Sequence, residues 1–213
     1  MKTRPLPFSI PMVRPTLDGT KTQTRRVAKI HRGKDCPEEM WPHAINDIVE
    51  WREQDGRWFG LMGYRTLAFA DCPYGKPGDR LWVREPWKTE AAVDHLPPRS
   101  LRSGAAIYYL ADGEPARAGR YRHARFMCRW MSRIELEIVS VRLERLQEIS
   151  DEDGRAEGCD HSSSEAAKAI GWCEKPRRAF RRVWEQINGA DSWAANPLVW
   201  VIEFRRLPVG GTP

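Results

Sequence analysis

The sequence predicts an α+β fold, a small β-barrel with helices packed outside it and inserted arms. Strand candidates dominate the order of elements, and helices do not alternate with them as they do in βαβ units. The apolar alternation of residues 132–146 changes phase near Ile138 and Val139, which indicates a β-bulge of the kind that bends a sheet into a barrel. We expect one domain at 8–206, with insertions at about 31–70 and 88–125 and a disordered tail at 207–213.

The first elements lead to a polar stretch, residues 19–26. We expect a strand at 8–10, a helix at 12–18 that ends at the C-cap glycine Gly19, and a strand at 21–27. If residues 21–27 form a strand, alternation places Lys21 and Arg25 on one face and Thr24 and Arg26 on the other. A helix would instead bring Lys21 close to Thr24. A plain reading is a solvated basic strand.

The middle of the chain carries two strand signals. A hairpin is expected from strands at 48–52 and 58–62 around the turn Asp55-Gly56, after a loop at 31–47. A half-buried strand at 81–85 follows the turn Pro77-Gly78. Glu85 would share the inward face of that strand, so it is either a ligand-binding or catalytic group or the partner of an inward arginine.

Residues 88–125 read as an arm with one hairpin, rich in Pro, Gly, Ala and Arg. Arginines alternate here with Tyr121 and His123, a pattern typical of nucleic-acid contacts, although a solvated loop explains it better. The residues expected to contact nucleic acid are Arg25, Arg117, Arg120, Arg122 and Arg125.

The last third predicts three helices and a strand. Ser150 begins a capped helix that ends at Gly158, so Glu157 lies in its last turn, where a carboxylate needs a cationic neighbour. Further helices are expected at 162–170 and from Pro176 to 188, and a strand at 198–204. The apolar stripe of the last helix consists of Phe180, Val183, Trp184 and Ile187.

Composition limits the classes of function. The chain carries 35 Lys and Arg against 29 Asp and Glu, a modest basic excess carried by arginine, which suits phosphate and base edges. Its five cysteines lack a C-x-x-C pair and its five histidines are scattered, so we expect a reducing compartment, no metal and no cofactor. Without an apolar run of signal or membrane-spanning type, we expect a soluble, cytoplasmic monomer with no membrane partner.

The motifs together resemble a known family. Gly19-Thr20-Lys21 with Thr24 and Arg26, residues 77–83, 149–158 and 200–204 are similar to the ASCH domain superfamily, and the long form is similar to ASCH-domain proteins of phages and prophages. The resemblance spans residues 8–206 and implies a PUA-like β-barrel linked to RNA metabolism. One branch, the N4-acetylcytidine amidohydrolases, is especially close.

That branch implies a catalytic set of Lys21, Thr24 and Glu157, the last at the end of the helix after the long strand. Substrate contacts are expected from Trp82, Arg84, Glu85 and Arg26. Two departures matter: the known enzymes are about half this size, and Gly154 replaces the alanine usual there. The substrate would be a modified nucleoside, free or within RNA or DNA.

The implied chemistry follows from the groups themselves. Thr24 would attack the acyl carbonyl, Lys21 would accept its proton, and Glu157 would hold the leaving amine. A nearby glutamate, however, favours the charged lysine and opposes its use as a base. A Lys21–Glu157 ion pair with a structural role therefore stays open. The alternatives in function are a non-catalytic RNA- or DNA-binding reader of a modified base and, third, a ribonuclease.

Overall fold

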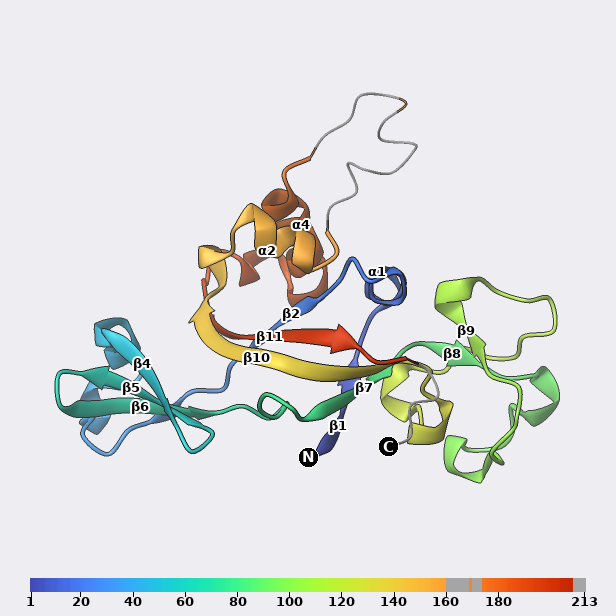
Figure 1. Cartoon of the computed structure of the whole chain (residues 1–213), viewed down its shortest axis with the longest axis horizontal. Coiled ribbons are helices and arrows are strands. Elements are labelled where there is room, and N and C mark those ends of the chain that lie inside the picture. Colours follow the sequence, from blue (N-terminus) through green and yellow to red (C-terminus); the bar gives the residue numbers. More distant parts are fainter. Residues whose placement is uncertain (160–168, 170–173, 209–213) are drawn as a thin grey trace.

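The computed structural model describes residues 1–159, 169 and 174–208, and it is a β-rich α+β structure (Figure 1). The strands are β1 Thr3–Pro7, β2 Gln23–Val27, β3 His31–Arg32, β4 Glu50–Gln54, β5 Arg57–Met62, β6 Arg65–Asp71, β7 Arg80–Arg84, β8 Trp87–Lys88, β9 Tyr108–Tyr109, β10 Glu135–Arg145 and β11 Leu198–Arg206. The α-helices are α1 Ile10–Asp18, α2 Asp151–Ala156 and α4 Pro176–Asn188. The helix expected at 162–170 and the end of the tail lie outside the described residues. Within these residues no helix is long and apolar enough to span a bilayer.

A five-stranded sheet in the order β1-β7-β10-β11-β2 forms the centre. β1 runs parallel to β7, and the other neighbours are antiparallel. A register shift between Ile138 and Ser140 confirms the predicted bulge in β10. The expected closed barrel is not found among the described strands, because β1 and β2 lie at opposite edges of the sheet and do not pair with each other.

The N-terminal segment differs from the expectation. The strand predicted at residues 8–10 is wrong: β1 ends at Pro7, and Ile10 already begins α1, with Pro11 in the first turn, where it costs no hydrogen bond. The predicted helix end is confirmed. Gly19 has a φ of 84°, the left-handed conformation that glycine adopts most readily.

Two hydrophobic clusters lie on opposite faces of the sheet. Alternate residues of β11 separate them: Trp200 and Ile202 enter one cluster, while Val199 and Val201 enter the other, beneath α2 and α4 (Figure 1). In α4, Phe180 and Trp184 are about 5% exposed, as the apolar stripe predicts. Ile187 is 57% exposed, because the sheet does not reach this last turn of the helix.

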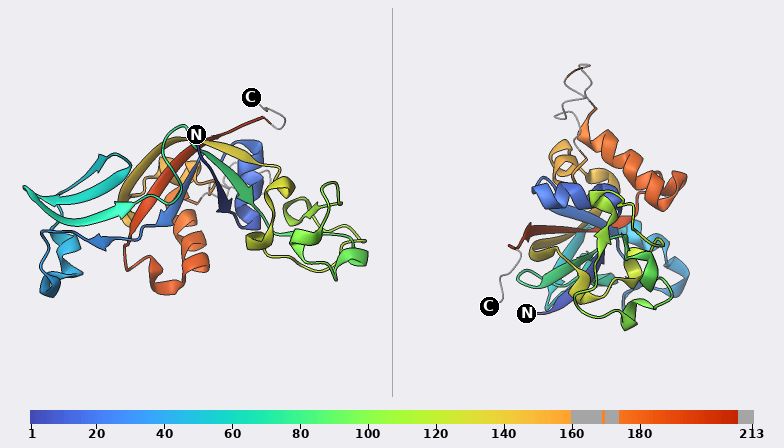
Figure 2. Two further views of the ribbon diagram at one scale, coloured as in Figure 1. Left: turned by 90° about the horizontal axis from the view of Figure 1, so that it is seen from below. Right: turned by 90° about the vertical axis from the view of Figure 1, so that its right-hand side faces the viewer.

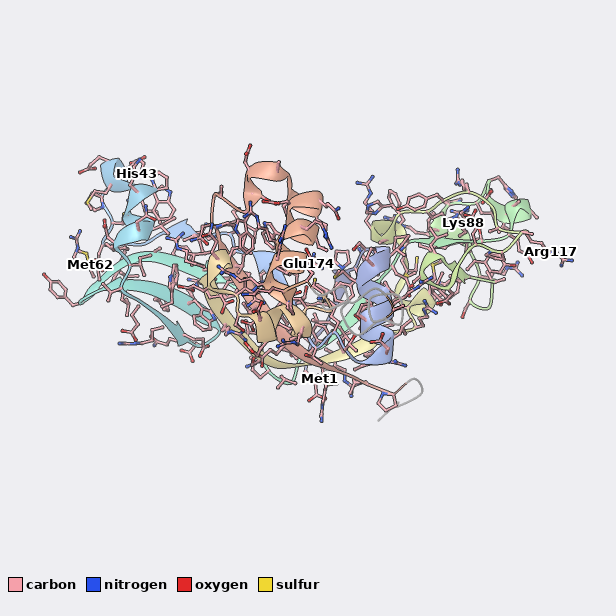
Figure 3. All side chains as sticks on the ribbon, turned by 90° about the horizontal axis from the view of Figure 1, so that it is seen from above. Met1, His43, Met62, Lys88, Arg117 and Glu174 are labelled. Carbon is pink, nitrogen blue, oxygen red and sulfur yellow. The ribbon has the colours of Figure 1, made fainter. Side chains whose placement is uncertain are left out.

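Two arms extend from opposite ends of this sheet (Figure 2). The hairpin arm, residues 31–71, contains the antiparallel sheet β3-β6-β5-β4; the turn Asp55-Gly56 is confirmed, and the strand β6 was missed. The arginine arm, residues 87–131, contains the short β8–β9 hairpin. In Figure 3, His43 and Met62 mark the first arm, and Lys88 and Arg117 mark the second.

Gly154 sits where α2 contacts the start of α4. A Cβ on this residue would come within 2.6 Å of the Pro176 carbonyl carbon and 2.8 Å of the Arg177 backbone nitrogen. This contact explains why glycine replaces the expected alanine: the backbones approach too closely for a methyl group. The two helices would have to move apart to admit one.

We therefore expect Gly154→Ala to lower the free energy of unfolding by about 1–3 kcal/mol, the usual cost of overpacking. Helix propensity alone would favour alanine by about 1 kcal/mol, so the two effects have opposite signs. Urea denaturation measures the difference, with Glu152→Ala on the exposed side of α2 as the control. A stabilised Gly154→Ala variant would contradict the close packing.

Candidate functional site

Lys21 lies between the end of α1 and the start of β2. The turn at Gly19 returns the chain so that the Lys21 backbone N–H donates to the Pro15 carbonyl at 2.9 Å. The next residue, Thr22, donates its N–H to the Ala156 carbonyl at 2.8 Å, which ties this segment to the end of α2. Lys21 is consequently 2% exposed, although it is a lysine.

The ammonium group of Lys21 is fully hydrogen-bonded. Nζ lies 2.7 Å from Glu157 Oε2, 2.9 Å from the Glu157 carbonyl oxygen and 2.7 Å from the Gln23 carbonyl oxygen. An ammonium group has three donors, and each has an acceptor here. The predicted cationic neighbour of Glu157 is thereby confirmed, and the ion pair joins residues that are 136 positions apart.

Arg25 extends this pair into a buried ion network. Its guanidinium lies 2.5 Å from Glu144 Oε1, 3.2 Å from Asp153 Oδ2 and 3.3 Å from Glu157 Oε1. Arg142 bridges Glu144 and Asp153 from the other side. The network secures α2 to β2 and β10, and it holds the Glu157 carboxylate between two cations.

Asp153 makes part of this network pH-dependent. Burial opposes its ionisation, but hydrogen bonds from the Ser150 N–H and the Gln23 amide, with the charges of Arg25 and Arg142, lower its pKa. A carboxyl group with a lowered folded-state pKa stabilises the fold above its ordinary pKa. That contribution is lost as the pH falls toward the folded-state value.

The side chains of Thr24 and Arg25 point to opposite faces of β2. Alternation places Thr24 with Arg26, against Ile202 and Trp200 of β11, whereas Arg25 faces α2 and α4. The residue is 4% exposed, yet its hydroxyl makes no hydrogen bond with any described residue. Both Thr24 and Lys21 line the cavity described next, but they are not hydrogen-bonded to each other.

A cavity of about 150 Å³ opens at this edge of the sheet. Its lining comes from α1, β2, the end of α2 and α4, and comprises Ser9, Met12, Lys21, Thr24, Arg25, Arg26, Val27, Glu157, Cys159, Phe180, Val183, Trp184, Ile187 and Asn188. An enclosed space of about this volume accommodates one six-membered ring. It is smaller than pockets that enclose a drug-sized ligand, so only part of a nucleoside fits inside.

Arg26 contributes a cation to the lining of this cavity. Nη2 donates to the Pro7 carbonyl at 2.6 Å, and the guanidinium lies 5.8 Å from the centre of the Phe8 ring. Nε is buried and has no hydrogen-bond partner within the described chain. Burial lowers the pKa of Arg26, but a guanidinium remains charged at neutral pH. Arg26 could therefore hydrogen-bond a carbonyl oxygen or an anion placed in the cavity.

Cys159 contributes a thiol to the cavity, beside the hydroxyls of Thr24 and Ser9. It is 1% exposed, and burial, with the nearby charge of Glu157, raises its pKa to about 12. At neutral pH it is a protonated thiol, which is a poor nucleophile. Thr24 is thus the better candidate for an attacking group.

We expect Cys159 to resist iodoacetamide in the folded protein at about pH 8, because alkylation requires a thiolate. Peptide mapping by mass spectrometry would show Cys159 unmodified and the more exposed Cys128 modified. Protein unfolded in urea is the control, in which both are modified. Alkylation of folded Cys159 as fast as Cys128 would contradict this assignment.

The structure does not bring every predicted substrate-binding residue into the cavity. Glu85 is 1% exposed and pairs with Arg133 through two contacts of 2.9 Å, which confirms the alternative that it partners an inward arginine. Burial raises the pKa of Glu85, and Arg133 opposes that effect. Trp82 is 6% exposed and lies under Arg84, next to the arginine arm.

Two of the predicted nucleic-acid contacts are wrong. Arg25 is 4% exposed and surrounded by carboxylates. Arg122 is also 4% exposed; it donates to the carbonyls of Leu96 and Val93 and lies over the Trp87 ring. Both arginines satisfy their charge inside the protein. Arg117, Arg120 and Arg125 are exposed.

Sequence reasoning missed the carboxylates that hold Arg25. Arg142 and Glu144 are two residues apart in β10 and lie on the same face. This spacing was the signal from which an ion network on that face could have been predicted. The apolar wall formed by Phe180 and Trp184 was predicted as core but not as cavity lining. No cluster of metal-ligating side chains occurs in the described part of the chain.

Comparisons with protein-family models, curated proteins and solved structures found no match. The site is therefore interpreted from its own geometry, which places the Thr24 hydroxyl, the Lys21–Glu157 ion pair and the Arg26 side chain around one ring-sized cavity. Such a set can activate an alcohol, donate a proton and stabilise an oxyanion, the needs of acyl transfer.

Proposed function

We propose that this protein is an amidohydrolase that removes an acyl group from the N4 amine of a modified cytidine, on a PUA-like, ASCH-type fold. The observation that carries the proposal is that Lys21, Thr24 and Glu157 line one cavity, although they come from distant parts of the chain. These are the residues that the resemblance to N4-acetylcytidine amidohydrolases implies. The ring-sized volume suits a pyrimidine base whose ribose stays outside.

The Lys21–Glu157 pair has to supply a base, because the lysine as observed holds all its protons. In the proposed reaction the bound pyrimidine ring excludes water from the cavity. A proton then passes from Lys21 Nζ to the Glu157 carboxylate 2.7 Å away. The neutral amine then accepts the Thr24 proton as Oγ1 forms a bond to the acyl carbon. Glu157 returns its proton to the departing N4 amine as the C–N bond breaks.

Water completes the cycle by hydrolysing the Thr24 ester. The amine of the nucleoside leaves the cavity, and a water molecule attacks the acyl carbon in its place. The Lys21–Glu157 pair accepts a proton from this water and gives one to Thr24 Oγ1 as the bond from Oγ1 to the acyl carbon breaks. Arg26 stabilises the oxyanion in both steps, since this cation lines the cavity. The overall reaction converts an N4-acyl cytidine and water into cytidine and a carboxylic acid, and needs no cofactor.

The test is chromatography with mass detection of N4-acetylcytidine incubated with the purified full chain. The proposal predicts cytidine and acetate in a time-dependent yield proportional to enzyme. Acetylated RNA is offered in parallel, because the cavity encloses only part of a nucleoside. If the protein deacylates neither the nucleoside nor the acetylated RNA, the proposed hydrolase activity is refuted.

The second candidate is a non-catalytic reader of a modified base. It is favoured by the same hydrogen bonds of Lys21, because a fully paired ammonium group suits a structural ion pair. A reader would bind N4-acetylcytidine in the cavity and release it unchanged. Equilibrium binding of the nucleoside without turnover would therefore identify it.

A further inference from the structure

A groove lies on the arginine arm and shares no lining residue with the cavity at β2. It consists of two hollows of about 780 and 410 Å³ that share Pro98 and Phe126. We call it the arginine groove; its charged and aromatic lining residues are Trp82, Arg84, Arg99, Arg120, Tyr121, Arg122, His123, Arg125, Phe126 and Arg129. Neither hollow is lined by an aspartate or a glutamate.

Two arginines of this groove are paired with carboxylates, Arg129 with Glu135 at 2.9 Å and Arg122 with Asp94 at 3.8 Å, and the others differ from those of the buried network. Arg99, Arg120 and Arg125 have no carboxylate within ion-pair distance in the described part of the chain, and all three are exposed. Arg84 lies over the Trp82 ring, 4.7 Å from its centre, and its Nη1 donates to the Arg125 carbonyl at 3.2 Å. By contrast, Arg25, Arg133 and Arg142 are each neutralised by carboxylates. The groove thus presents positive charge that an anion can reach.

Aromatic faces accompany this charge. Phe126 is 50% exposed and Tyr121 is 55% exposed, although both are large apolar side chains in an otherwise packed arm. Arg125 lies over the Phe126 ring, 4.8 Å from its centre, so the cation covers one face of the ring and a base would stack on the other. Proteins that bind single strands combine these two features, because guanidinium groups hold phosphates and aromatic rings stack on unpaired bases.

We propose that the arginine groove binds single-stranded nucleic acid, with Arg84, Arg99 and Arg125 on its phosphates and Phe126 and Tyr121 on its bases. An acidic peptide would use the charge but leave the rings unexplained, and a duplex hides its base faces. The inference is independent of the reaction proposed above, since no groove residue lines the cavity at β2. Loss of strand binding and loss of deacylation are therefore separate results.

Fluorescence anisotropy of labelled single strands of about ten nucleotides, as DNA and as RNA, tests the proposal with the full chain. The expected affinity falls steeply between about 50 and 200 mM salt, because phosphate contacts release counterions. Arg99→Ala with Arg125→Ala should weaken binding at least about tenfold and reduce the salt slope by about 1.4. Phe126→Leu should weaken it about tenfold without changing the slope, because stacking is uncharged.

The matched control is Arg52→Ala with Arg57→Ala, which removes the same charge from the hairpin arm and should change binding by less than about twofold. Circular dichroism confirms that each variant is folded. Equal losses in the two double variants would overturn the proposal, since only net charge would then matter. So would binding of a duplex or of polyglutamate as tight as that of the single strand.

Discussion

Replacing Arg25 by alanine is expected to lower the free energy of unfolding by about 3–5 kcal/mol, the cost of breaking a buried ion network by removing one partner. The guanidinium is 1% exposed and lies within 3.3 Å of carboxylate oxygens of Glu144, Asp153 and Glu157. Without it, these carboxylates would be buried close to one another with less positive charge to offset them. Urea denaturation of the purified variant measures the loss.

Arg205→Ala is the matched control. Arg205 pairs only with Glu137 among the described residues, and its side chain is 67% exposed, so its removal should cost about 0–1 kcal/mol. Arg25→Lys keeps the charge but loses the planar fork that contacts several carboxylates, and should fall between the two. Equal losses for Arg25→Ala and Arg205→Ala would show that the network contributes no more than a surface pair.

Glu157→Gln is expected to lower deacylation of N4-acetylcytidine by about a hundred- to ten-thousand-fold, the usual range for a general acid–base group. The amide keeps the size of the side chain but cannot accept a proton from Lys21 or return it to the leaving amine. Single-turnover rates measured by quenched chromatography give this loss directly. A thermal melt of the same sample confirms that the variant is folded.

Asp153→Asn separates catalysis from stability. It weakens the same ion network, since Asp153 contacts Arg25 and Arg142, but Asp153 does not line the cavity. We expect this variant to be less stable and to keep most of its activity. If Glu157→Gln and Asp153→Asn lost activity in equal measure, the Lys21–Glu157 pair would be a structural support for the sheet.

Local signals predicted the elements that surround the site. Ser150 and Gly158 bounded α2, Gly19 ended α1, and the change of phase near Ile138 located the bulge in β10, because capping, left-handed glycine and alternation depend on neighbouring residues. The prediction that Glu157 needs a cation is confirmed for a similar reason. A carboxylate at the end of a helix faces the negative end of the helix dipole, wherever its partner comes from.

Long-range features were not predictable in this way. Arg25 and Arg122 were predicted to be exposed and to contact nucleic acid, yet both are buried. Carboxylates from other segments pair with Arg25, and backbone carbonyls from other segments accept hydrogen bonds from Arg122. The open sheet instead of a barrel depends on which edge β1 occupies, and nothing local to β1 specifies its pairing with β7. The cavity exists only where four separate elements meet, so its residues could be proposed through a family resemblance but not located.

The most direct test of the proposed reaction compares Thr24→Val with Thr24→Ser in the release of cytidine from N4-acetylcytidine. Valine matches threonine in shape and lacks only the nucleophile, whereas serine retains it. The account predicts loss of at least about a thousandfold for valine and of less than about tenfold for serine, with both variants folded. Cytidine release by Thr24→Val at the wild-type rate would contradict it, as would a wild-type protein that releases none.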